Sequence, residues 1–186
     1  MRPLFYAVLL LCLPAAAWAA DDGFGDASRI ASEHFDIFYK SGVDINTLIS
    51  QLNISQSDQV LTGQSIDTAS QDKQLASMLD VLFARAGDVL DMHLYSYKGN
   101  IKVFATQEQL RDFFYAKYHQ DLPCNGVSFY LDDFNSIYIS AADFRREVLG
   151  HEMGHTVMSH YFVVQPSVKI QEVLAGYVEY QLRKSK

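Results

Sequence analysis

The chain has 186 residues, of which 49% are hydrophobic and 13% aromatic, so it is long enough for one domain with a substantial core and too short for two full ones. Its 22 acidic residues outnumber its 15 lysines and arginines, and the formal net charge is −7 at pH 7. An acidic chain without a cluster of lysine and arginine would release few counterions from phosphates, which argues against binding to nucleic acid or to anionic membranes.

The first 19 residues have the composition of a secretory signal peptide. Arg2 gives a positive start, residues 4–13 are almost all apolar, and Ala17 and Ala19 stand at the two positions that a signal peptidase reads. An uncleaved transmembrane anchor is the alternative, but Pro14 interrupts the apolar run, which falls short of the roughly 20 residues that a membrane span requires. Cleavage after Ala19 would remove one cation, so we expect an exported, clearly acidic protein without a stable membrane span.

After cleavage, a flexible leader is expected over residues 20–32, followed by one domain over residues 33–186. Apolar and polar side chains alternate along residues 33–40, which predicts a half-buried strand. His34 has no partner at ligand spacing, so its side chain is expected to be structural or exposed to solvent. Residues 45–65 carry scattered apolar side chains and favour one or two short helices joined by a turn.

The clearest helical pattern lies between residues 75 and 90, where apolar side chains recur at i, i+3, i+4 and i+7 over four turns. This predicts an amphipathic helix packed on a sheet. Gly99-Asn100 is expected to form a turn, and residues 101–105 alternate as a second strand. Thr106 can cap the helix that follows, and Gln109 completes a capping-box pattern.

Two short alternating segments, residues 127–131 and 136–140, are separated by polar residues and predict a hairpin. One strand edge of the hairpin could lie beside the site described below and accept an extended peptide as an additional strand, whereas the alternative is an ordinary inner strand. Cys124, in the break before the hairpin, would be the only cysteine after signal cleavage. It therefore cannot form an intrachain disulfide, and a buried side chain is favoured over a reactive thiol.

Residues 151–155 read His-Glu-Met-Gly-His, a His-Glu-x-x-His motif within a segment predicted to be helical from about residues 141–143 to Tyr161. Positions four apart lie on one face of a helix, so His151 and His155 can hold one metal ion. Glu152 would lie beside the ion and take a proton from a water molecule that zinc activates. The alternative is a surface helix that merely carries two histidines.

A second helix is predicted over residues 168–182, and the short link before it favours antiparallel packing on the first. This packing would bring Glu172 against both histidines as the third ligand and leave one position of the ion for water. Glu179 and His160 are the alternative ligands. His160 is five residues past His155, about 140° round the helix, and should point away, whereas Glu179 is expected to support the site or to be exposed.

The motif and the segment Glu-Val-Leu-Ala-Gly-Tyr at residues 172–177 resemble gluzincin metallopeptidases, in particular the small exported peptidase MA-like proteins of bacteria. The likeness covers most of the mature chain. It implies an α+β, zincin-like domain with a small mixed or antiparallel sheet packed on helices. It also implies a zinc ion held by His151, His155 and Glu172, with Glu152 as the general base, and a periplasmic or secreted location.

Two features depart from the family pattern. Val173 stands where many relatives have glycine, and only 14 residues follow Glu172. Larger gluzincins place a tyrosine or histidine downstream to stabilise the oxyanion, and the candidates here are Tyr177, His160 and Tyr161.

We therefore expect a zinc-dependent metallopeptidase that hydrolyses peptides or proteins, as an endopeptidase rather than an exopeptidase. The alternatives are a non-catalytic zinc-binding exported module with a structural or adaptor role, and a structural protein without metal.

Overall fold

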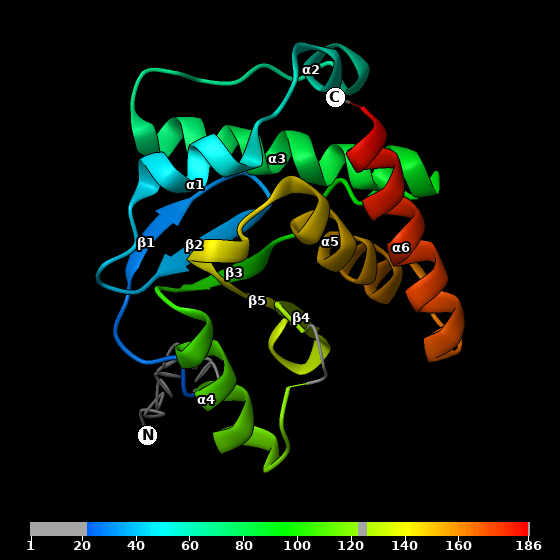
Figure 1. Cartoon of the computed structure of the whole chain (residues 1–186). Coiled ribbons are helices and arrows are strands. Elements are labelled where there is room, and N and C mark those ends of the chain that lie inside the picture. The colour runs from blue at the N-terminus through cyan, green and yellow to red at the C-terminus, as the bar shows by residue number, and fades with distance from the viewer. Residues whose placement is uncertain (1–21, 123–125, 186) are drawn as a thin grey trace, which may run out of the picture.

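The computed structural model describes residues 22–122 and 126–185, so the predicted signal peptide and Cys124 lie outside the described residues. Its centre is a five-stranded mixed sheet with the strand order β1-β2-β3-β5-β4 (Figure 1). The strands are β1 (Ser28–Ala31), β2 (Phe35–Tyr39), β3 (Gly99–Phe104), β4 (Ser128–Leu131) and β5 (Ser136–Ser140). The three inner strands are parallel, and β1 and β4 pair antiparallel at the two edges.

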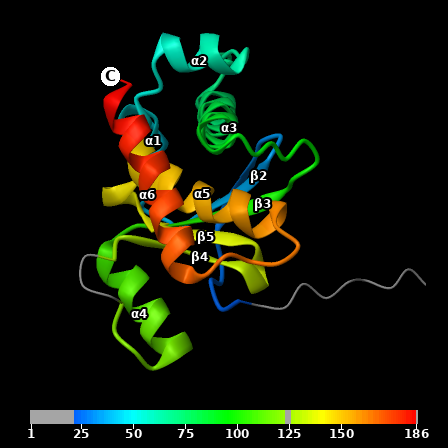
Figure 2. The ribbon, with the colours of Figure 1, turned by 90° about the vertical axis from the view of Figure 1, so that its right-hand side faces the viewer.

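Helices cover both faces of this sheet. The α-helices of the described residues are α1 (Ile45–Leu52), α2 (Gln56–Thr62), α3 (Gln71–Leu90), α4 (Gln107–Tyr118), α5 (Arg146–Tyr161) and α6 (Val168–Lys184). Helices α1 and α3 lie on one side of the sheet and α4 on the other, while α5 packs between α3 and α6 and also contacts β4 (Figures 1 and 2). This mixed architecture is compatible with the α+β class expected from the sequence. None of these helices combines the length and the apolar character that a membrane crossing requires.

The sheet buries apolar side chains on both faces. Ile37, Ile101 and Ile137 lie side by side on the three inner strands and belong to the larger core cluster, with α1, α3, α5 and α6. Phe104 and Tyr138 belong to a smaller cluster that packs against α4. Full burial of one large apolar side chain contributes about 1.5–3 kcal/mol, so the buried residues of the inner strands contribute strongly to the stability of the domain.

Most of the predicted elements are confirmed. Helix α3 begins four residues before the predicted amphipathic segment and ends with it at Leu90. Thr106 accepts a hydrogen bond from the backbone N–H of Gln109 at 3.2 Å and caps α4. Strands β4 and β5 form the predicted hairpin. His34 is buried, with Nδ1 3.3 Å from the carbonyl oxygen of Tyr97, so its role is structural.

The flexible leader predicted for residues 20–32 is wrong over the described residues, in which Asp22, Phe24 and Ile30 are buried. Residues 28–31 form the edge strand β1, because Ile30 is buried in the core and Arg29 makes a 2.7 Å ion pair with Asp36 on β2. The turn predicted at Gly99-Asn100 is also wrong, since both residues belong to β3. A side chain at position 99 would collide with the hydroxyl of Tyr97, which explains the glycine inside a strand.

Asp22 fixes the first described residues to the sheet. Its buried carboxylate accepts hydrogen bonds from Lys102, from the Tyr138 hydroxyl and from the backbone N–H of Phe24. Burial by itself would raise the pKa of Asp22, but these hydrogen bonds outweigh burial and hold the pKa below its ordinary value of 3.8. The ionised carboxylate therefore stabilises the folded state at neutral pH.

Replacing Asp22 by asparagine is expected to lower the free energy of unfolding at pH 7 by about 1–3 kcal/mol. A depressed folded-state pKa means that this contribution is complete above pH 3.8 and is lost as the pH falls through the folded-state pKa. Urea unfolding of both proteins at pH 7 and pH ~3 measures the difference. A stability difference that is as large at the lower pH as at pH 7 would contradict this assignment.

Candidate metal centre

Helix α5 carries the His-Glu-x-x-His motif but begins later than predicted. Residues Ala141–Asp143 form a separate 3-10 turn, and the Asp143 carbonyl accepts a hydrogen bond from the backbone N–H of Arg145 at 2.7 Å. The Asp143 carboxylate accepts from the Ser140 hydroxyl at 2.8 Å, so it does not cap the helix. Helix α5 therefore starts at Arg146, without a side-chain cap, and ends at Tyr161 as predicted.

The structure brings together His151 and His155 from α5 and Glu172 from α6. The two Nε2 atoms are 3.2 Å apart, and the Glu172 carboxylate oxygens lie 3.6 Å from His151 Nε2 and 3.4 Å from His155 Nε2. In the described part of the chain, these three side chains form the one group of histidine, cysteine and carboxylate residues that could hold a metal ion.

The spacing of these atoms fits a tetrahedral zinc ion. With bonds of about 2.0–2.2 Å, two ligand atoms of such an ion lie roughly 3.3–3.6 Å apart, close to the distance between the two Nε2 atoms and to the distance from each of them to one Glu172 oxygen, Oε2 for His151 and Oε1 for His155. Two imidazole nitrogens and one carboxylate are also a donor set that zinc accepts in catalytic sites, where a fourth position stays open. The three residues therefore fit the metal that the motif predicts.

Close packing of α5 on α6 places Glu172 opposite the histidines. Ala175, Val178 and Leu182 are buried on the side of α6 that faces Gly150 and Gly154 of α5. A Cβ atom at Gly154 would lie 3.2 Å from the Cα atom of Ala175, which is tighter than an ordinary contact. The glycine before each histidine of the motif thus lets the two helix backbones approach.

Replacing Gly154 by valine is expected to separate α5 from α6 and to lower both zinc affinity and stability, the latter by about 1–3 kcal/mol, as overpacking does. The matched control is Gly176→Val on α6, because nothing lies within 4 Å of a Cβ atom at Gly176. Zinc titration and thermal unfolding of the two variants measure the contrast. Equal effects of the two substitutions would show that close approach at Gly154 does not position the ligands.

Glu152 follows the first histidine and is buried against the edge strand β4. Its Oε1 accepts a 2.7 Å hydrogen bond from the hydroxyl of Ser128. Burial raises the pKa of Glu152 and the charge of Glu172 acts in the same direction, while the Ser128 hydrogen bond and His151 oppose the rise. Burial also lowers the pKa of His155, which favours the neutral imidazole that a metal requires.

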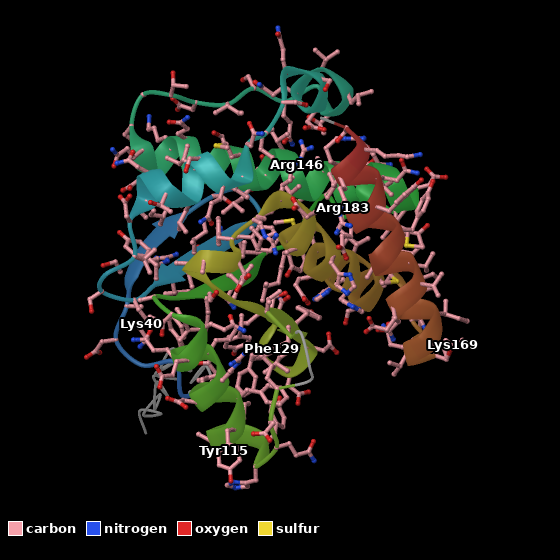
Figure 3. The ribbon with its side chains drawn as sticks, viewed as in Figure 1. Lys40, Tyr115, Phe129, Arg146, Lys169 and Arg183 are labelled. Atoms are coloured by element: carbon pink, nitrogen blue, oxygen red, sulfur yellow. The ribbon has the colours of Figure 1, made fainter. Side chains whose placement is uncertain are left out.

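A cleft of about 1020 Å³ opens at this site. Figure 3 labels Phe129 on β4, which lines the cleft, and Lys169 in the first turn of α6, which does not. Its lining combines the motif residues with apolar and polar side chains of β4, α5, α6 and their neighbours: Phe114, Leu122, Gly126, Val127, Ser128, Phe129, Tyr130, Asp132, Arg145, Val148, His151, Glu152, His155, Ser159, Gln165, Gln171, Glu172 and Glu179.

The three candidates for oxyanion stabilisation are not among the lining residues of this cleft. His160 points away, as predicted, with Nδ1 3.1 Å from the Thr156 carbonyl oxygen and its ring packed edge-on against Tyr97. Tyr161 and Tyr177 are about half exposed.

Several polar residues of the cleft were not predicted. Ser128, Tyr130 and Asp132 lie in or just after β4, Arg145 precedes α5, and Gln171 precedes the candidate ligand Glu172. None of them has a distinctive spacing from the motif. For Ser128, the only signal in the sequence was its place in a strand that the hairpin could set beside the site.

Comparison with known proteins gives no match to this chain. No protein-family model fits the sequence, and no curated protein or solved structure is significantly similar to it. The assignment of a function therefore depends on the motif and on the geometry of the residues around it.

Proposed function

We propose that this protein is an exported, zinc-dependent metallopeptidase of the gluzincin type. The observation that carries the proposal is the convergence of His151, His155 and Glu172 beside the buried carboxylate of Glu152. The two Nε2 atoms are 3.2 Å apart, and each lies within 3.6 Å of a Glu172 carboxylate oxygen. These groups lie in a cleft large enough for a peptide.

The three ligands would hold the zinc ion through two imidazole nitrogens and one carboxylate. Bound there, zinc supplies Lewis-acid chemistry: it polarises a carbonyl group and lowers the pKa of water to about 7. Glu152 is the general base, which takes a proton from the attacking water as the new C–O bond forms. Glu152 then gives this proton to the leaving amine as the C–N bond breaks. The Ser128 hydroxyl donates a hydrogen bond to Oε1 of Glu152 and restrains the side chain beside the three ligands.

The edge strand β4 supports a peptide as the substrate. It is the last strand of the sheet, and its residues 128–130 line the cleft. An extended peptide can add to such an edge through backbone hydrogen bonds.

The length of the cleft supports an endopeptidase. Its lining residues on α5 and just before it run from Arg145 to Ser159, on both sides of the histidine pair. This distance is about 21 Å along a helix, enough for about six extended residues. Substrate could therefore extend in both directions from the scissile bond.

Replacing Glu172 by alanine is expected to lower zinc affinity by at least about 100-fold, since loss of a partner outside the ligand shell already costs 10–100-fold. The wild-type protein should contain about one zinc per chain and cleave casein or a peptide library. Elemental analysis and a chromophoric chelator measure the metal. Glu147→Ala, which removes an α5 carboxylate outside the cleft, is the control, and wild-type protein without zinc at neutral pH would contradict the proposal.

A non-catalytic zinc-binding module is the second candidate function. It is favoured by one observation: His160, Tyr161 and Tyr177 all lie outside the lining of the cleft. Such a module would lose zinc and stability in Glu172→Ala but would show no peptide cleavage that depends on Glu152. Zinc binding by wild-type protein without any turnover of the library would favour this candidate.

A further inference from the structure

A second carboxylate of α6 lies against the first zinc-ligating histidine. Glu179 Oε2 is 3.4 Å from His151 Nδ1, on the side of the ring opposite the nitrogen that faces the other ligands. This Nδ1 atom is buried and has no hydrogen-bond partner in the structure. A buried imidazole nitrogen without a partner is unusual, and the nearby acceptor identifies the group that would satisfy it.

Helix geometry explains why Glu179 meets His151 and not His155. Glu179 is seven residues beyond Glu172, which is two turns along α6 on nearly the same face. Because α6 runs antiparallel to α5, a position further along α6 lies closer to the start of α5. Glu172 thus meets both histidines, and Glu179 meets the one nearer the N-terminus of α5.

Glu179 is itself held in place from the opposite side. Its Oε1 accepts a hydrogen bond from Arg183, one turn further along α6. The side chain of Glu179 is partly buried, whereas that of Arg183 is mostly exposed. Arg183 therefore limits the rotation of a carboxylate whose other oxygen is directed at the imidazole.

We propose that Glu179 is a positioning residue, which accepts a hydrogen bond from Nδ1–H of His151 and thereby presents the Nε2 lone pair to the metal. This inference rests on the proposed zinc site. A neutral imidazole carries its proton on one of two nitrogens, and the hydrogen bond at one nitrogen decides which of them can bind a metal. A carboxylate at Nδ1 also raises the basicity of the ligand and fixes the plane of its ring.

The tautomer of His151 tests this role in the full-length, zinc-free protein. Long-range ¹H–¹⁵N NMR, at a pH about two units above the usual histidine pKa of ~6.5, distinguishes Nδ1–H from Nε2–H. Wild-type protein is expected to have mainly Nδ1–H at His151, and Glu179→Ala to shift the ring toward Nε2–H. Glu179→Gln keeps an acceptor oxygen and should retain most of the Nδ1–H form.

Zinc affinity provides the second measurement. Glu179→Ala is expected to weaken zinc binding roughly 10–100-fold, and Glu179→Gln to weaken it less. Arg183→Ala is the matched control, because it removes the same Glu179–Arg183 pair but keeps the carboxylate beside His151. It should shift the His151 tautomer much less than Glu179→Ala does, because the carboxylate is still present, and its zinc-free melting temperature should match that of Glu179→Ala.

An unchanged tautomer in Glu179→Ala overturns the proposal, and so does an unchanged zinc affinity in a variant whose tautomer has shifted. A wild-type protein that binds no zinc refutes the proposed function instead. The zinc-free NMR measurement still decides in that case whether Glu179 orients His151, so the two failures can be told apart.

Discussion

Replacing Glu152 by glutamine is expected to lower the rate of peptide cleavage by roughly 10²–10⁴-fold while zinc stays bound. Glutamine has nearly the same shape and can still accept the hydrogen bond of Ser128, but it cannot take a proton from water. Because the side chain of Glu152 does not belong to the three-ligand group, the metal content should not change. The measurements are kcat on a cleaved peptide and zinc per chain.

The same substitution should not destabilise the zinc-free protein. Burial raises the pKa of Glu152, so its ionised form opposes folding at neutral pH. An acid with a raised folded-state pKa contributes most to the free energy of unfolding at low pH, and this contribution is lost as the pH rises through that pKa. A neutral glutamine removes this cost, and the melting temperature at pH 7 should be equal or higher.

The control for Glu152→Gln is Glu147→Gln, which changes a carboxylate five residues earlier on α5, outside the cleft. It should leave both the cleavage rate and the zinc content unchanged. Full cleavage activity in Glu152→Gln would contradict the role of Glu152 as the base. Parallel loss of zinc would show instead that the substitution disturbs the ligands.

The sequence predicts the elements of the site better than the sheet that carries them. The spacing of His151 and His155 places both side chains on one face of any helix. The link before residue 168 is short, so the next helix has to run back along the first. Local rules therefore suffice to bring Glu172 to the histidines, as the 3.4 and 3.6 Å distances show. Whether these atoms bind zinc stays a prediction.

The sheet depends on contacts between residues far apart in the chain. Strand β1 was missed because a four-residue strand with one buried apolar side chain, Ile30, has almost no periodic pattern. Gly99 was assigned to a turn because the sequence does not show that the Tyr97 side chain packs against the backbone of residue 99. The hairpin was predicted, but its position was left open between an edge beside the site and an inner strand: β4 lies at the edge and β5 is an inner strand.

The polar contacts around the site follow from the same long-range packing. Ser128 meets Glu152 only because β4 is the outer strand next to α5. Glu179 meets His151 only because α6 runs antiparallel at close distance, which Gly150 and Gly154 permit. A motif predicts the ligands, but the residues that orient them depend on the register between elements.

The largest expected loss of stability comes from Asp58, whose side chain ties α2 to α3 and α5. Its buried carboxylate lies 3.4 Å from the guanidinium of Arg146, the first residue of α5, and 3.5 Å from Arg85 on α3. It also accepts hydrogen bonds from the hydroxyl and the backbone N–H of Ser55, which cap α2. Asp58→Ala should lower the free energy of unfolding by about 3–5 kcal/mol, because it leaves the buried Arg146 without an anionic partner.

An exposed ion pair provides the comparison for this effect. Asp67 lies 3.6 Å from Lys73 with both side chains in solvent, and Asp67→Ala should cost at most about 1 kcal/mol. The double variant Asp58→Ala/Arg146→Met leaves no buried charge at the start of α5. If the penalty of Asp58→Ala arises from the unpaired cation, the double variant should recover part of the lost free energy of unfolding. Urea unfolding of the single and double variants measures this coupling. A double variant whose loss equals the sum of the two single losses would show that the charges do not interact, and that Asp58 acts only as the cap of α2.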